Sequence, residues 1–183
     1  MMRKFVLFGP PGSGKGTLAE YMSKKLDIKH YSTGQMLRKE VASKTDLGCA
    51  IQSTIESGSL VSDEMMNDLV SSHLEEEYIL DGYPRTVEQV DHLIQLNPPN
   101  CIIFIDVNIE AAVGRLTNRA KEQGRKDDDA DVIQKRIKLY QDETKPVLSY
   151  WLEMHPAQVF WPIDGNVSID DVRKQFDEGK WSF

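Results

Sequence analysis

The fold is decided by one stretch, Phe5-Val6-Leu7-Phe8-Gly9-Pro10-Pro11-Gly12-Ser13-Gly14-Lys15-Gly16-Thr17. Four apolar residues that end at glycine and proline are typical of a buried strand, and Leu18, Met22 and Leu26 then recur at helical spacing. Between them, the glycines let successive backbone N–H groups turn inward, the helix start adds partial positive charge, and Lys15 adds a full charge. A plain glycine turn would not need that lysine, so the stretch predicts a strand, a phosphate-binding loop and a helix.

The same order of strand, loop and helix recurs along the chain. Further apolar runs lie at 28–31, 78–80, 101–107 and 158–163, and segments with helical spacing separate them. Strands separated by helices of about 10 to 15 residues are typical of a parallel sheet that is covered on both faces. We therefore expect a single α/β domain over residues 1–183, with a five-stranded parallel sheet.

Two stretches interrupt this order. Three helices and no strand are expected between the second and third strands, at 36–42, 47–56 and 62–74. The polar run 120–131 contains no apolar side chain larger than alanine, so it is not expected to contribute to the core. Both stretches are candidates for parts that move over a ligand.

Composition narrows the function classes. The chain has 22 Lys and Arg residues against 29 Asp and Glu residues, a net charge of −7, which argues against nucleic-acid and membrane partners. Cys49 and Cys101 are too few for a disulfide scaffold, and we expect both to be buried. Because no signal peptide or membrane-length apolar run is visible, we predict a cytoplasmic protein.

Arginines follow the predicted loops at fixed places. The segments that carry them are Ser32-Thr33-Gly34-Gln35-Met36-Leu37-Arg38, Asp81-Gly82-Tyr83-Pro84-Arg85-Thr86-Val87-Glu88-Gln89, and the series Arg115, Arg119, Arg125 and Arg136. A guanidinium group binds phosphate through two parallel hydrogen bonds, which lysine cannot reproduce. Where a phosphoryl group passes from one phosphate to another, the site must supply orientation and positive charge rather than a base, because the acceptor oxygen is already deprotonated.

These segments resemble the successive signatures of the adenylate kinases, a branch of the nucleoside monophosphate kinases, over almost the whole chain. The phosphate loop resembles them too, since Gly16 precedes Thr17 where the strict P-loop pattern has Ser or Thr directly after the lysine. The resemblance implies the P-loop nucleoside triphosphate-binding fold, with a helical NMP-binding insertion at 32–61 and a lid at 119–130. Only five residues separate Arg119 from Arg125, which implies the short-lid form without structural zinc.

The activity that the resemblance implies is reversible transfer of the ATP γ-phosphate to AMP, giving two ADP by direct in-line transfer. The residues that would bind ATP are Gly12, Ser13, Gly14, Lys15, Gly16, Thr17, Arg115 and Arg119. The residues that would bind AMP are Thr33, Gly34, Arg38, Leu60, Val61, Gly82, Arg85, Gln89, Arg125 and Arg136. The catalytic set would be Lys15, Arg85, Arg119, Arg125 and Arg136.

Within these sets, the resemblance implies particular contacts. Arg38 and Arg85 would hold the AMP phosphate, and Gln89 would contact the edge of the adenine. Arg115 would stack on the ATP base. Gln89 also has a structural interpretation, because Thr86-x-x-Gln89 fits a capping box at a helix start, and the two interpretations are compatible.

Asp81 ends an apolar strand, where ligands approach a parallel sheet. The resemblance implies that it holds Mg²⁺ through water, with Thr17 as a second metal contact; the alternative is an aspartate that only caps the next turn. The family normally has an aspartate after the Thr-Gly pair, but Gln35 stands there. We therefore expect weaker magnesium affinity with activity retained.

Asp127 and Asp128 have two interpretations that do not exclude each other. They fit a solvated helix start, where negative charge is favourable, and the resemblance implies that they also pair with lid arginines on closure. We expect a monomer that binds ATP, AMP and ADP.

Two alternative functions remain open. A UMP/CMP kinase would share the fold and most arginines, but Thr33 and Gln89 favour adenine, because related pyrimidine enzymes usually have Ala and Asn there. A non-catalytic nucleotide sensor of the same fold would be expected to lack Lys15, Arg85 or a lid arginine, and none is missing.

Overall fold

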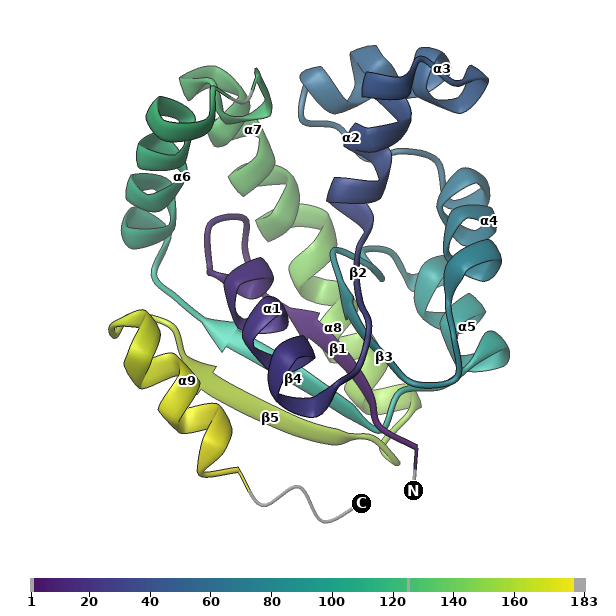
Figure 1. The fold of residues 1–183 in the computed structure, drawn as a ribbon, viewed down its shortest axis with the longest axis vertical. Helices are drawn as coiled ribbons and strands as arrows, with labels where there is room; N and C mark the ends of the chain where they lie inside the picture. The colour runs from purple at the N-terminus through teal and green to yellow at the C-terminus, as the bar shows by residue number, and fades with distance from the viewer. Residues whose placement is uncertain (1, 125, 180–183) are drawn as a thin grey trace.

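The computed structural model describes residues 2–124 and 126–179. Five parallel strands form one sheet in the order β2-β3-β1-β4-β5 (Figure 1). Their bounds are Lys4–Phe8 for β1, His30–Ser32 for β2, Tyr78–Asp81 for β3, Cys101–Asp106 for β4 and Val159–Asp164 for β5. The predicted five-stranded parallel sheet is confirmed, and β2 begins two residues later than the apolar run at 28–31 suggested.

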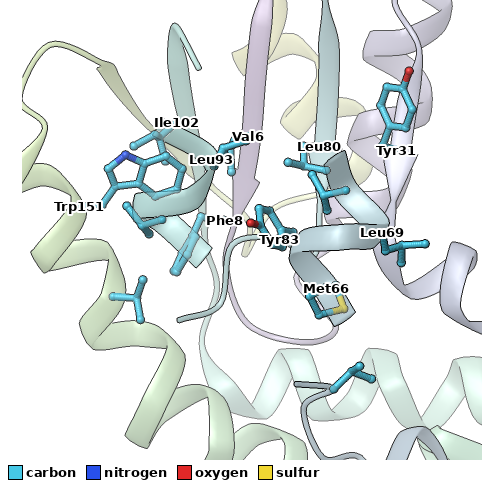
Figure 2. Packing of buried hydrophobic residues seen from close by; sticks show 14 of the residues in the cluster. Val6, Phe8, Tyr31, Met66, Leu69, Leu80, Tyr83, Leu93, Ile102 and Trp151 are labelled. Atoms are coloured by element: carbon cyan, nitrogen blue, oxygen red, sulfur yellow. The ribbon is translucent and has the colours of Figure 1, made fainter. Parts of the chain in front are cut away.

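Helices cover both faces of the sheet because alternate residues of the strands are buried on opposite sides. On one face, α1 (Lys15–Leu26) and α9 (Ile169–Asp177) pack over Phe5, Leu7 and Ile103. On the other face, α5 (Val87–Leu96) and α8 (Lys145–Met154) pack over the opposite strand residues. Figure 2 shows this second layer, in which Val6, Phe8 and Ile102 face Leu93 and Trp151.

Three helices lie between β2 and β3, as the sequence predicts. They are α2 (Thr33–Ser43), α3 (Asp46–Glu56) and α4 (Asp63–His73). Thr45 and Ser62 each cap a helix, accepting a hydrogen bond from the backbone N–H three residues on. In Figure 1, α2 and α3 rise above the sheet, opposite the start of α7.

The segment after β4 is more helical than expected. Helix α6 (Ile109–Gln123) extends four residues into the polar run 120–131, and a 3₁₀ turn at Lys126–Asp128 leads into α7 (Ala130–Leu139). A π-helical turn at Tyr140–Thr144 joins α7 to α8, so helical structure runs from 130 to 154. The sequence analysis assigned no element to that stretch.

The two cysteines differ. Cys101 is buried in β4, as expected, and burial raises the pKa of its thiol to about 12. The expectation for Cys49 is wrong, because α3 turns it to the exposed side of the helix while Ile51 faces the core. None of the helices in the described ranges is long and apolar enough to cross a membrane.

Candidate active site

The glycine-rich loop lies between the end of β1 and the start of α1. Gly12 has a φ of +80°, and a Cβ there would lie 2.4 Å from the carbonyl oxygen of Ala112, so only glycine fits where the loop meets α6. Gly14, with a φ of +94°, stands at the N-cap of α1. A glycine cap has no side chain to occupy the first N–H groups of the helix, and such a helix start favours an anion.

Lys15 curls back over this loop. Its Nζ donates hydrogen bonds of 2.8 Å to the carbonyl oxygens of Gly9 and Pro10. Burial lowers the pKa of Lys15 to about 8, against the opposing influence of Asp81, and Arg85 lowers it further. The ammonium group is therefore a partly desolvated charge at the base of a positively charged site.

A hollow opens above the loop, and we call it the loop hollow. The predicted site residues that line it are Gly12, Gly14, Lys15, Gly16, Thr17, Gly34, Arg38, Asp81, Gly82, Arg85, Arg119 and Arg136. Ser13 belongs to the loop but does not line the hollow. It is 2% exposed, and its Oγ is 3.3 Å from Lys15 Nζ. Gln35 is exposed and lines the hollow from α2.

A second hollow lies beneath α2 and α3, and we call it the insertion hollow. The predicted site residues that line it are Thr33, Gly34, Arg38, Leu60, Val61, Gly82, Arg85, Gln89, Asp127 and Arg136. Leu37, Ile55 and Met66 form an apolar part of its wall. Six residues line both hollows: Gly34, Arg38, Gly58, Gly82, Arg85 and Arg136. The two hollows therefore meet, and three arginines lie where they join.

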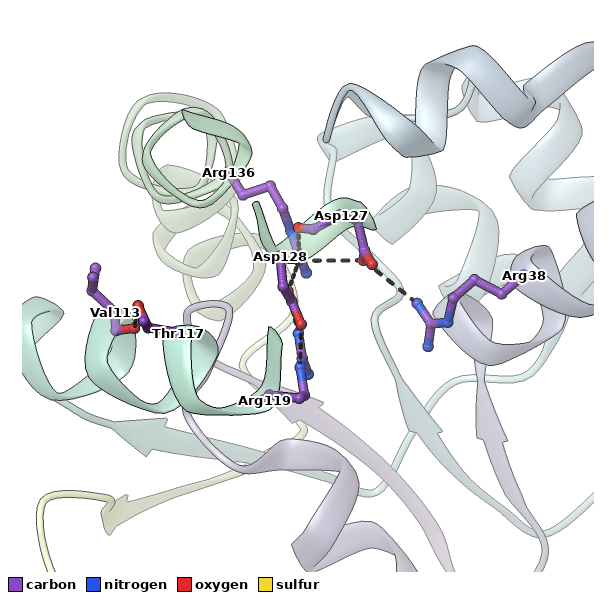
Figure 3. A network of polar contacts seen from close by, with 7 residues as sticks. All are labelled: Arg38, Val113, Thr117, Arg119, Asp127, Asp128 and Arg136. Carbon is purple, nitrogen blue, oxygen red and sulfur yellow. Dashed lines mark hydrogen bonds and ion pairs between the residues drawn. The ribbon is translucent and has the colours of Figure 1, made fainter. Parts of the chain in front are cut away.

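Two aspartates, Asp127 and Asp128, connect Arg38, Arg119 and Arg136 (Figure 3). Asp128 accepts two hydrogen bonds from Arg119, of 2.6 and 2.7 Å, and one of 2.8 Å from Arg136. Asp127 Oδ2 lies 3.3 Å from Arg136 Nη1 and 3.8 Å from Nη1 of Arg38, on α2. Burial lowers the pKa of Arg136 to about 10, and both aspartates oppose the shift. The network joins α2, α6 and α7.

The solvated interpretation of these aspartates is wrong. Asp127 is 8% exposed and Asp128 1% exposed, because arginines from neighbouring helices surround them. A buried carboxylate requires such partners. Whether the pairs act in closure stays a prediction.

The loop after β3 holds Arg85 and Gln89 in place. Arg85 Nε donates to the carbonyl oxygen of Gly82 at 2.8 Å, and burial lowers the pKa of its guanidinium, while Asp81 opposes the shift. The Thr86 hydroxyl accepts from the Gln89 N–H at 3.2 Å, which is half of the predicted capping box. The other half differs, because Gln89 Oε1 accepts from the backbone N–H of Arg85 instead of that of Thr86.

The three remaining predicted residues are Arg115, Arg125 and Asp81. Arg115 lines neither hollow, and its Nη2 donates to the carbonyl oxygen of Gly165 at 2.7 Å. Arg125 lies outside the described residues. Asp81 does not cap the next turn: within the described chain no residue of that turn donates a hydrogen bond to its carboxylate. The Nε2 of His30 lies 4.0 Å from Asp81 Oδ2, and burial lowers the pKa of that imidazole.

Sequence reasoning missed several residues at the site. Tyr140 and Thr144, from the π-helical turn, line the loop hollow, and no local pattern marked them. Asp63 accepts hydrogen bonds from Thr86 Oγ1 at 2.9 Å and from Gln89 Nε2 at 2.6 Å. In the sequence, Asp63 is only an acid near the start of the helix expected at 62–74, and nothing local links it to Gln89, 26 residues away.

A phosphate loop at the end of a central parallel strand, beside two joined hollows with arginines at the junction, defines a P-loop phosphotransferase that acts between two phosphorylated ligands. The family model for adenylate kinase matches residues 7–155. The chain therefore belongs to the adenylate kinase family, which confirms the resemblance, the fold and the enzyme class predicted from the sequence.

Curated relatives agree over nearly the full length. An adenylate kinase from Stenotrophomonas maltophilia is 41% identical over 158 residues, which cover 81% of this chain and 84% of that protein. The adenylate kinase of a second strain is 40% identical over 179 residues, covering 92% and 94%. One from a Cyanothece species is 39% identical over 184 residues, covering 95% and 93%.

Proposed function

We propose that the chain transfers the γ-phosphoryl group of ATP to AMP, reversibly and without a phosphoenzyme. An oxygen of the AMP phosphate forms a bond to the γ-phosphorus as the bond from that phosphorus to the β,γ-bridging oxygen breaks, and two ADP result. The observation that carries this proposal is the junction of the two hollows, where Arg38, Arg85 and Arg136 line both. Two nucleotides bound end to end would bring their phosphates to that junction.

In this proposal, the loop hollow takes ATP. The loop amides and the start of α1 hold its β- and γ-phosphates, and Lys15 exchanges its bonds to Gly9 and Pro10 for bonds to phosphate oxygens. Arg119 and Arg136 stabilise the charge on the migrating group, as arginines do in other phosphoryl-transfer enzymes. Arg115 stacks on the ATP base through the face of its planar guanidinium, which leaves the in-plane hydrogen bond from its Nη2 to the carbonyl oxygen of Gly165 intact.

The insertion hollow takes AMP. Arg38 and Arg85 bind its phosphate, while the apolar wall and Gln89 hold the base. Thr33 is 1% exposed and donates to the carbonyl oxygen of Asp81 at 3.2 Å, so it shapes the floor at the junction of the two hollows. Residues 32–61 and 119–130 are proposed to close over the ligands, excluding water that would otherwise hydrolyse ATP.

The donor set fits a hydrated Mg²⁺ bound with ATP. Asp81 and Thr17 both line the loop hollow and would hold the ion, Asp81 through water, because Mg²⁺ keeps much of its hydration shell. When bound, the ion neutralises charge on the phosphates. Among the described residues no three His, Cys, Asp or Glu side chains group as metal ligands, so one carboxylate and the phosphates would carry the ion.

The test is a coupled assay with ATP and Mg²⁺ against AMP, CMP, UMP and GMP. We expect AMP to be the preferred acceptor, whereas preference for CMP or UMP would support the pyrimidine alternative. Two adenosines joined through five phosphates should bind with one molecule per chain and compete with both substrates. A chain that binds nucleotides without turnover would be a sensor.

Monomeric state and cytoplasmic location stay predictions, testable by light scattering and by fractionation.

A further inference from the structure

The side-chain amide of Gln89 is held by two partners of opposite kind. Its Oε1 accepts from the backbone N–H of Arg85 at 2.8 Å, and its Nε2 donates to Asp63 Oδ1 at 2.6 Å. A backbone N–H is always a donor, and an ionised carboxylate is always an acceptor. If the amide were turned over, a donor would face the Arg85 N–H and an acceptor would face Asp63. The two partners therefore fix which end of the amide is the donor.

Asp63 is itself held in position. It lies in the first turn of α4, and the same Oδ1 also accepts from Thr86 Oγ1 at 2.9 Å. Thr86 in turn accepts from the Gln89 N–H, so both contacts anchor Asp63 to the start of α5. Gln89 is 2% exposed and lines the insertion hollow. An amide this buried keeps its orientation when a base arrives.

One N–H and one acceptor position of the Gln89 amide remain for a ligand. The edge of an adenine presents an amino donor next to a ring-nitrogen acceptor, and a 6-oxopurine presents an acceptor next to an N–H donor. An amide fixed in one orientation matches only one of these orders, whereas an amide that can turn matches both. The orientation of this amide therefore decides whether the site favours a 6-aminopurine or a 6-oxopurine.

We propose that Asp63 is a positioning residue that sets the specificity of the AMP site for a 6-aminopurine by fixing the Gln89 amide. This rests on the proposed function, in which Gln89 contacts the base. Without Asp63, the bond from Arg85 still favours Oε1 on its side, but Nε2 loses its partner, so the amide swings about that bond and no longer presents one fixed donor and acceptor order. AMP loses more affinity than inosine monophosphate, which differs from it at the 6-position and N1.

The experiment measures kcat/KM for AMP and for inosine monophosphate with the full chain and with Asp63→Ala. We expect the AMP-to-inosine ratio to fall about tenfold, mainly through the KM for AMP, as for loss of one paired amide–base contact. Asp63→Asn keeps an oxygen acceptor and should retain most of the ratio. Glu64→Ala removes an exposed acid from the same helix turn and should leave the ratio unchanged.

Thermal unfolding of each variant separates specificity from folding. If Asp63→Ala does not fold, Asp63→Ser, whose hydroxyl is one bond shorter and suits a helix start, is judged by the same ratio. An unchanged ratio in folded Asp63→Ala, or in folded Asp63→Ser where the alanine variant does not fold, overturns the inference, even if stability falls. Failure of the unmodified chain to phosphorylate AMP would instead overturn the proposed function.

Discussion

The glycine-loop end of the loop hollow presents positive charge through backbone N–H groups and one ammonium, whereas the insertion hollow and its junction with the loop hollow present it through guanidinium groups from separate segments. Gly12, Gly14 and Lys15 are neighbours in the chain, so the glycine-loop end of the loop hollow forms locally. Arg38 comes from α2 and Arg136 from α7, almost a hundred residues apart, so the insertion hollow exists only in the folded chain. The glycine loop binds negative charge with a turn that forms locally. The arginine-lined insertion hollow depends on how the helices are placed relative to one another.

The two hollows also differ in how their charges are held before a nucleotide binds. Lys15 is bonded to backbone carbonyl oxygens of its own loop. Arg136 is bonded to Asp127 and Asp128, which belong to the segment between α6 and α7. Repulsion between the arginine charges is therefore offset by two carboxylates that lie between two helices. The lysine charge is instead held by carbonyl oxygens of its own loop. Four experiments test this contrast.

The largest effect is expected for Lys15→Met. This change removes the only full charge within the glycine loop, so kcat should fall about 10³-fold, as when one group that stabilises the transition state is lost. Steady-state rates with saturating ATP and AMP measure it, and Lys24→Met, on the exposed side of α1, is the matched control. A loss below tenfold would mean that the backbone alone suffices.

Arg38→Ala should affect the binding of AMP much more than the binding of ATP. Loss of a charged hydrogen-bonding partner of phosphate costs about 2–3 kcal/mol, so the KM for AMP should rise about 100-fold while the KM for ATP stays within about threefold. Initial rates with each substrate varied in turn give both constants. Lys39→Ala, an exposed neighbour on α2, is the control. Equal increases in the two KM values would contradict separate sites.

Rising pH should weaken ATP binding more than AMP binding. The pKa of Lys15 is lowered to about 8 by burial, so its charge is present below that pH and is lost as pH rises through it. The Kd for ATP should rise about tenfold between pH 7 and pH 9, while the arginines keep their protons. Calorimetry at each pH measures both nucleotides, and the dependence for ATP should vanish in Lys15→Met.

The smallest effect is expected for Gln35→Asp. Gln35 lies on α2, in the insertion at 32–61, and lines the loop hollow in which we propose that ATP binds. A second carboxylate beside Asp81 should lower the Mg²⁺ concentration for half-maximal rate about threefold, since Mg²⁺ prefers charged oxygen ligands. Gln35→Asn shortens the side chain equally without adding charge. If both variants respond to Mg²⁺ like the unmodified chain, position 35 has no part in metal binding.

The sequence predicts the local parts of this molecule well. The strand, loop and helix from Phe5 to Leu26 follow from residue spacing alone, and so do the five strands, because apolar runs and glycine turns act over short distances. The arginine positions followed from motifs that resemble a known family. Most of them line the two hollows.

The features that the sequence did not reveal depend on long-range contacts. Asp127 and Asp128 are polar residues in a polar run, and only the approach of Arg119 and Arg136 makes their burial possible. Cys49 was misplaced because its helix has apolar residues around it and the chain alone does not say which side faces inward. Asp63 and Gln89 meet only because α4 and α5 pack together.

Gly58, which lines both hollows, sits where the insertion meets α7. Its φ is +72°, and a Cβ there would lie 2.8 Å from Arg136 Cγ and 2.8 Å from Val132 Cγ1. The absence of a side chain therefore sets how near the two segments can come. A bulky residue at this position would keep the insertion away from α7. Such a variant is a route to isolating the protein with its two hollows open.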